Sequence, residues 1–136
     1  MYLNKTIAAA LALMLGGIAG AQTQAEMNEQ AVRDFNRADA ALNAQYKVTQ
    51  AFMVNLYTQS KASLPPAERK GLSSEAMLLA SERAWLRFRD AQCELENYQS
   101  IGGTIHGFGV TMCMTDLTLK RTKQLKDLQT TNPNYR

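Results

Sequence analysis

The chain has 136 residues, which is enough for one domain of ordinary size. Its 15 Lys and Arg residues barely outnumber its 12 Asp and Glu residues, so that the net charge is +3 at pH 7. So small a charge, with basic and acidic residues alternating along the chain, excludes the basic footprint of a nucleic-acid-binding protein.

Residues 1–21 have the order of a cleaved secretory signal. One basic residue, Lys5, precedes an apolar run over residues 6–15, and small residues follow it and end in Ala19-Gly20-Ala21. We expect cleavage after Ala21, which leaves one helical domain over residues 22–136. A membrane anchor is the weaker alternative, because residues 6–21 are too few for a spanning helix of about 20 residues. Since no Cys stands at the cleavage point to carry a lipid, we predict a periplasmic or secreted protein without a membrane anchor.

The first segment after the signal with helical periodicity covers residues 28–61 and contains no Gly or Pro. Polar Asp39 and Thr49 interrupt its inward stripe, which consists of Val32, Phe35, Leu42, Tyr46, Met53 and Leu56. Pro65 and Pro66 end the segment, because proline lacks a backbone N–H. A short helical turn is expected over residues 66–70.

Two further helical segments follow, over residues 73–99 and 108–128, with a loop of three glycines between them. Ser73 and Ser74 are both favourable N-caps for the first of these two. Their inward stripes consist of Leu78, Leu79, Trp85, Leu86 and Cys93, and of Val110, Cys113, Met114, Leu117, Leu125 and Leu128. No segment alternates with the period of a strand. We therefore predict an all-α fold, a small three- to four-helix bundle in which the last two segments form an antiparallel hairpin and the first packs across it.

The two cysteines test this hairpin. Cys93 and Cys113 each lie ten residues from Gly103, so they are level with one another if the loop turns there. An exported chain meets an oxidising compartment, and two cysteines allow one intramolecular pairing. We predict a Cys93–Cys113 disulfide that staples the hairpin; two buried free thiols are the alternative.

The chain also resembles a known family. The resemblance is carried by Asp39, Leu42, Asn43 and Tyr46 in the first segment, by Trp85, Arg89, Asp90 and Cys93 in the second, and by Cys113 and Arg121 in the third. This ordered set resembles the LprI-like lysozyme-inhibitor family, formerly a bacterial domain of unknown function. The resemblance implies an exported, helical, usually disulfide-bonded protein whose partner is a protein, possibly a lysozyme. The chain departs from the family's lipoprotein namesake in lacking a lipid-anchor cysteine, and it has Glu82 where many relatives carry Gln.

The residues that carry the resemblance also have a structural interpretation. Leu42 and Tyr46 lie one helical turn apart and can pack on Trp85, whose ring needs apolar neighbours. Inward-facing charges must be paired, because an isolated buried charge is very costly. Asp39, Glu82 or Asp90 can pair with Arg89 or Arg121. We predict a polar cluster of Asp39, Arg89 and Arg121 between the helices.

The sequence lacks the motifs of an enzyme. It has no metalloprotease, nucleophile-elbow, phosphate-loop or dinucleotide-binding motif, and its single histidine, His106, cannot form a His-rich zinc site. We expect no enzyme, no cofactor and no metal. A hydrolase whose carboxylates meet only on folding is the least favoured alternative.

The glycine-rich loop is the candidate binding site. A protruding loop with a few polar tips can enter an enzyme cleft, and the candidate residues are Ser100, Thr104, Ile105 and His106. An exposed loop histidine without such a role is the simpler interpretation of His106. Most animal lysozymes are basic, and a net charge of the same sign on this protein does not steer the two together, which weighs against a lysozyme as the partner. A local acidic patch at Asp90, Glu94 and Glu96 can still do so. We predict a protein that blocks its partner sterically; the alternative is an envelope protein with a different protein partner, such as a toxin antagonist or an assembly factor.

Overall fold

The computed structural model describes residues 23–68 and 73–130. Within these ranges the chain forms three long helices and one short one: α1 (Gln24–Ser63), α2 (Ser74–Glu96), the 3-10 helix η1 (Tyr98–Ser100) and α3 (His106–Asp127). The described residues contain no strand. The predicted all-α class is therefore confirmed. Residues 66–68 of the turn predicted over residues 66–70 do form a turn, closed by a hydrogen bond from the N–H of Glu68 to the carbonyl oxygen of Pro65. The last two residues of that turn, the signal over residues 1–21 and the tail beyond residue 130 lie outside what is described.

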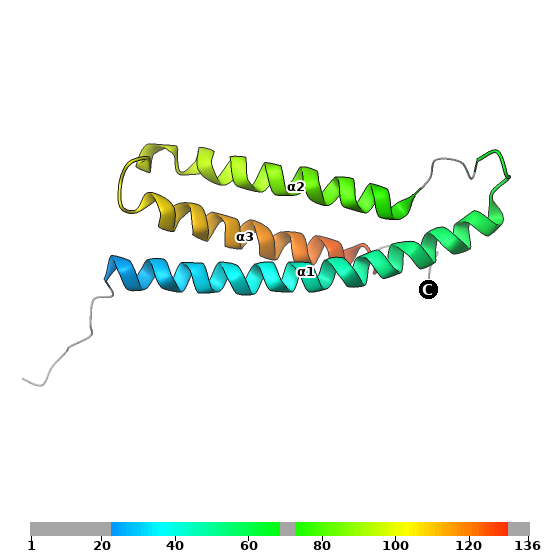
Figure 1. Ribbon diagram of the computed structural model, residues 1–136, viewed down its shortest axis with the longest axis horizontal. Helices are drawn as coiled ribbons and strands as arrows, with labels where there is room; N and C mark the ends of the chain where they lie inside the picture. Colours follow the sequence, from blue (N-terminus) through cyan, green and yellow to red (C-terminus); the bar gives the residue numbers. More distant parts are fainter. Residues whose placement is uncertain (1–22, 69–72, 131–136) are drawn as a thin grey trace, which may run out of the picture.

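The three long helices lie side by side in an elongated bundle (Figure 1). α2 runs antiparallel to α1 and α3, and α3 lies between the other two in this view. α3 has its most extensive contacts with α1 and fewer with α2. The first helix was expected to pack across the hairpin, but it runs alongside α3 instead. None of the helices in the described part of the chain is long and apolar enough to cross a membrane.

α1 has 40 residues and is about 60 Å long. It begins four residues earlier than predicted because Thr23 and Glu26 form a capping box, in which each side chain accepts a hydrogen bond from the other residue's backbone N–H. It ends at Ser63, where the N–H of Leu64 donates to the carbonyl oxygen of Lys61 before the two prolines. The helix therefore extends well beyond the shorter α3.

The boundaries of the hairpin differ slightly from those predicted. Ser73 caps α2 by accepting a hydrogen bond from the N–H of Ala76. α2 ends at Glu96, three residues early, and the chain continues as η1. α3 begins at His106, two residues before the predicted Phe108, so His106 belongs to the helix and not to the loop.

The core is narrow and lies along the three helices. Leu42, Leu78 and Leu125 form its centre, one from each helix, with Tyr46, Met53 and Trp85 packed against them. The buried hydroxyl of Thr49 donates to the carbonyl oxygen of Leu125 at 3.2 Å, so this interruption of the apolar stripe is satisfied.

Three residues expected to face inward are exposed, namely Val32, Leu79 and Leu128. Before Leu42, the buried residues of α1 are instead Ala31 and Ala38, at 2% and 3% exposure. Alanine leaves the neighbouring helix free to approach closely, and the position one residue further along then turns toward solvent. Because Val32 is larger and more apolar than Ala31, the sequence predicted that Val32 faces the core, whereas Ala31 does.

Candidate functional site

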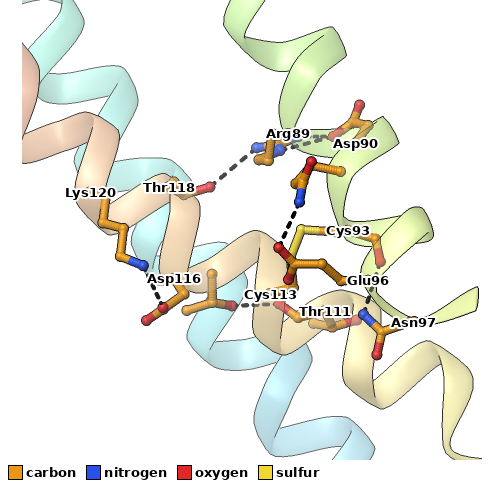
Figure 2. Close-up of a disulfide and its surroundings, with 12 residues drawn as sticks. Arg89, Asp90, Cys93, Glu96, Asn97, Thr111, Cys113, Asp116, Thr118 and Lys120 are labelled. Carbon is orange, nitrogen blue, oxygen red and sulfur yellow. Dashed lines mark hydrogen bonds and ion pairs between the residues drawn. A yellow bond between two sulfur atoms is a disulfide. The ribbon is translucent and has the colours of Figure 1, made fainter.

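The disulfide Cys93–Cys113 joins α2 to α3 near the loop that connects them (Figure 2). The two Cα atoms are 5.6 Å apart, and Cys93 is completely buried. This confirms both the predicted pairing and the predicted register of the hairpin. The carboxylate of Glu96 lies 3.3 Å from the sulfur of Cys113, a contact and not a hydrogen bond because a disulfide sulfur carries no proton.

Between the disulfide and α3, hydrogen bonds hold the chain in a fixed course. The amide of Asn97 donates to the carbonyl oxygen of Cys93 at 2.9 Å, and the hydroxyl of Ser100 donates to the carbonyl oxygen of Asn97 at 2.8 Å. Gly102 has a φ of 80°, a backbone conformation that favours glycine. The loop after η1 thus begins with a tight turn at Gly102, and the hydrogen bonds of Asn97 and Ser100 hold the end of α2 from which it starts.

His106 completes this anchor. Its Nδ1 atom lies 3.2 Å from the hydroxyl of Ser100 and 3.3 Å from the carbonyl oxygen of Asn97. Its Nε2 atom lies 3.2 Å from the carboxylate of Glu94, which is itself exposed. Because both ring nitrogens have partners within the hairpin, His106 fastens the start of α3 to the end of α2.

The predicted binding loop therefore divides into two parts. Ser100 and His106 are half-buried and contact each other, whereas Thr104 and Ile105 are exposed. The structure adds Ile101, which sequence analysis missed; it is 60% exposed, and Ile105 is 54% exposed. We call residues 101–105 the loop tip. The sequence did offer a signal for Ile101. It directly precedes Gly102 in the predicted glycine-rich loop, and so lies outside the helices whose inward faces form the core.

Trp85 is the centre of the polar cluster between the helices. The guanidinium carbons of Arg89 and Arg121 lie 5.3 and 5.8 Å from the centre of its ring, at cation–π distance. Arg89 also lies 5.3 Å from the ring of Phe35, which belongs to α1. The aromatic rings therefore cover the two arginines and hold them in place.

Each arginine has its own acidic partner. Arg89 lies 2.8 Å from Asp90 and 3.9 Å from Asp39, and it donates to the hydroxyl of Thr118 at 3.3 Å. Figure 2 shows its contacts with Asp90 and Thr118 one turn from the disulfide. Of the residues predicted to form a cluster, Asp39 and Arg89 therefore lie within ion-pair distance of each other.

Arg121 has a partner that the predicted cluster left out. It lies 3.0 Å from Glu82, and the two side chains are 13% and 11% exposed. Arg121 also donates to the hydroxyl of Ser81 at 2.8 Å. Glu82 lies one turn before Trp85 on the inward face of α2, and it is one of the acidic residues that the sequence offered as a partner of Arg121.

The cluster has no free group to offer a ligand. Among the described residues, no buried side-chain nitrogen or oxygen lacks a hydrogen-bond partner. No group of three or more His, Cys, Asp and Glu residues within that part of the chain is placed to hold a metal ion. The arrangement joins three helices through Asp39 of α1, Arg89 of α2 and Thr118 of α3.

Comparison with known proteins identifies the family. The family described as lysozyme inhibitor LprI matches residues 18–125. The chain belongs to this family. The matched span contains the disulfide, the cluster around Trp85 and the loop tip. An uncharacterized protein of Rhizobium meliloti (strain 1021) is 32% identical over 114 residues, which cover 84% of this chain and 79% of that protein. No solved structure is significantly similar to this one.

In this LprI-family protein, the cluster and the hairpin end are consecutive parts of one frame. Arg89 lies one turn before Cys93 on α2, and Asn97 lies one turn after it. The polar cluster therefore fixes the two helices that the disulfide joins, and the disulfide fixes the end that carries the loop tip. Family membership indicates a protein partner such as a lysozyme. At the end of the hairpin, residues 101–105 of the loop tip are all exposed.

Proposed function

We propose that the chain is an exported protein that inhibits a lysozyme by placing its loop tip in or over the substrate cleft. The observation that carries the proposal is the exposure of Ile101 and Ile105 at the end of a hairpin that a disulfide holds rigid. Exposed apolar side chains on a pre-ordered loop bind a cleft at a low entropic cost, because little of the loop must be ordered on binding.

The charges near the loop tip support the same partner. The carboxylates of Asp90, Glu94 and Glu96 are exposed along the last turns of α2. Many lysozymes are basic, and opposite local charge speeds the approach of two proteins even where their net charges have the same sign. The acidic end of α2 would thus direct the loop tip toward a basic enzyme surface.

The inhibition is proposed to be steric, without chemistry. The groups near the loop tip that have acid–base character are used within the hairpin: His106 contacts Glu94, Ser100 and the backbone of Asn97. Their role in this proposal is to hold the loop tip in one conformation. Thr104, which is exposed, supplies the polar side chain that hydrogen-bonds to the partner.

Export is supported by two features of the sequence and one of the structure. Residues 1–21 have the order of a secretory signal, and the chain contains two cysteines only. Those cysteines are joined in a disulfide, which is typical of oxidising compartments. We propose the periplasm or the exterior of the cell as the place where the protein acts, without a membrane anchor after signal cleavage.

The proposal is tested by titrating lysozymes of several classes with the purified, oxidised protein and measuring cell-wall hydrolysis. We expect inhibition of at least one class that saturates near one inhibitor per enzyme. Ile101→Asp should weaken it about tenfold or more, as expected for an apolar anchor at the centre of an interface. Val48→Asp, a change at an exposed apolar residue of α1, is the matched control. If no class is inhibited, the partner is another envelope protein, such as a toxin or an assembly partner.

A further inference from the structure

One flank of α2 is apolar although no other helix of the chain covers it. Its residues recur at alternating spacings of four and three, the spacing by which helices pack along a shared seam. We call this set the outer stripe, and it consists of Met77, Ser81, Ala84, Phe88, Ala91, Leu95 and Tyr98. All seven are exposed; Phe88, Met77, Leu95 and Tyr98 are 54%, 65%, 69% and 69% exposed. Contiguous exposed apolar surface of this kind marks an interaction site.

The order of large and small residues in the outer stripe fits a second copy of itself. Consider two α2 helices packed antiparallel, with a two-fold axis that passes between residues 89 and 90. Ala84 of one copy is then level with Leu95 of the other, and Phe88 is level with Ala91. At each end, Ser81 is level with Tyr98. Phe88 and Leu95 of α2 and Tyr98 of η1 thus each meet a small side chain, which is the condition for close packing of two helices. The fourth large residue, Met77, is level with residue 102, beyond the end of α2.

The charges beside the outer stripe agree with this arrangement. Arg87 and Glu94 lie two turns apart on one edge of the stripe and are both exposed. In the antiparallel pair, Arg87 of one copy is level with residue 92 of the other. Glu94 is two residues from that level, which is about 3 Å along the helix axis. By symmetry the contact occurs twice. Arg87 has no ion-pair partner of its own within the described chain.

We propose that the outer stripe of α2 binds the outer stripe of a second copy of this chain, antiparallel, to form a two-fold symmetric dimer. Such an isologous interface uses the same patch on both copies. The loop tips lie at opposite ends of the paired helices, outside the interface, so the dimer presents two of them. The proposal does not depend on the partner of the loop tip.

The test is sedimentation equilibrium of the oxidised protein, purified as the cell processes it, at concentrations up to about 200 μM, where an association of moderate affinity is populated. We expect a dimer. Phe88→Glu should give a monomer of unchanged helix content, because Phe88 is exposed in the single chain. Val48→Glu, which alters a side chain of the same 54% exposure on α1, should leave the dimer intact. A monomeric wild-type protein, or a Phe88→Glu variant that still dimerises, would overturn the proposal.

The register has its own test. Ala91→Trp places a large side chain against Phe88 of the other copy, so it should weaken dimerisation at least tenfold although Ala91 contacts solvent in the single chain. Arg87→Glu should weaken it as well, and the double variant Arg87→Glu/Glu94→Arg should restore it. If Ala91→Trp strengthened the dimer, or if the charge exchange failed to restore it, the antiparallel register would be wrong. Lysozyme inhibition is measured in parallel for Phe88→Glu and Ala91→Trp, which alter neither the loop tip nor its anchor, so that the two proposals are tested separately. The variant with Glu94→Arg is left out of that comparison, because Glu94 contacts His106.

Discussion

Trp85 is the residue around which the charged side chains of the interior are arranged. Its ring contacts Arg89 toward the disulfide and Arg121 from α3, and each arginine has an acidic partner. The Arg121–Glu82 pair is the more deeply buried acid–base contact between two helices. Removing one member of such a pair costs more than the pair contributes, because the other charge stays buried without a partner.

This argument gives a prediction for Arg121. Arg121→Ala should lower the free energy of unfolding by about 3 kcal/mol, since Glu82 then has no counter-charge. The measurement is urea denaturation followed by circular dichroism. The double variant Arg121→Ala/Glu82→Ala should be more stable than the single one. If Arg121→Ala were as stable as the wild type, the pair would not hold the helices together.

Two glycines in the first turns of α3 provide a second prediction at the residue scale. A side chain at Gly109 would collide with the amide of Asn97, which anchors the end of α2, whereas a side chain at Gly107 would meet open space. Gly107→Ala should stabilise the protein by about 0.5–1 kcal/mol, as alanine does within a helix. Gly109→Ala should instead displace Asn97 and increase hydrogen exchange over residues 97–105. Equal gains in thermal stability from both changes would contradict this role of Gly109.

At the scale of elements, the contact between α1 and α3 depends on small residues. Ala31 and Ala38 are almost completely buried, and they are the buried residues of α1 that precede Leu42. This is also where the sequence misled. Val32 and Leu79 looked like core residues by hydrophobicity, and a pattern of apolar residues cannot tell a buried alanine from an exposed one.

Ala38 tests this close approach. Ala38→Leu should destabilise the protein by about 1–3 kcal/mol, because Ala38 is 3% exposed and a larger side chain at a buried position forces its neighbours to shift. Ala40→Leu, two residues along on an exposed position, is the control and should change stability little. Thermal unfolding of the two variants gives the comparison. A neutral Ala38→Leu would show that α1 and α3 can separate without cost.

The hairpin of α2 and α3 is the element that the sequence predicted best. The equal distances of Cys93 and Cys113 from Gly103 gave the register, because a disulfide demands level positions in an antiparallel pair. The internal contacts of His106 were beyond reach of the sequence. They depend on the 3-10 helix η1, which brings Ser100 and Asn97 next to the imidazole, and no local sequence motif predicts this helix.

Removal of the disulfide tests the hairpin directly. Cys93→Ala/Cys113→Ala should lower the free energy of unfolding by roughly 3 kcal/mol, the chain-entropy value for a loop of this size. The variant should keep its helices but lose protection from hydrogen exchange in the loop tip. A loop tip as well protected as in the wild type would mean that His106 and Asn97 suffice to hold it.

On the scale of the whole molecule, the protein is a long frame with its candidate recognition site at one end. The disulfide and the end of α2 lie at the end of the bundle where α1 begins (Figure 1). The all-α class and the hairpin followed from the sequence, because helical periodicity and cysteine spacing are local signals. The side-by-side course of α1 and α3 did not, since it depends on which faces of three helices meet.

The measurement that tests steric blocking most directly is competition for a lysozyme that the protein binds. Isothermal titration calorimetry would compare the binding of the oxidised protein to the free enzyme and to the enzyme saturated with a chito-oligosaccharide, which occupies the substrate cleft. If the loop tip lies in or over that cleft, the oligosaccharide should weaken binding in proportion to its own occupancy, and Ile101→Asp should weaken binding to the free enzyme. Binding that the oligosaccharide leaves unchanged would place the contact elsewhere and contradict the account.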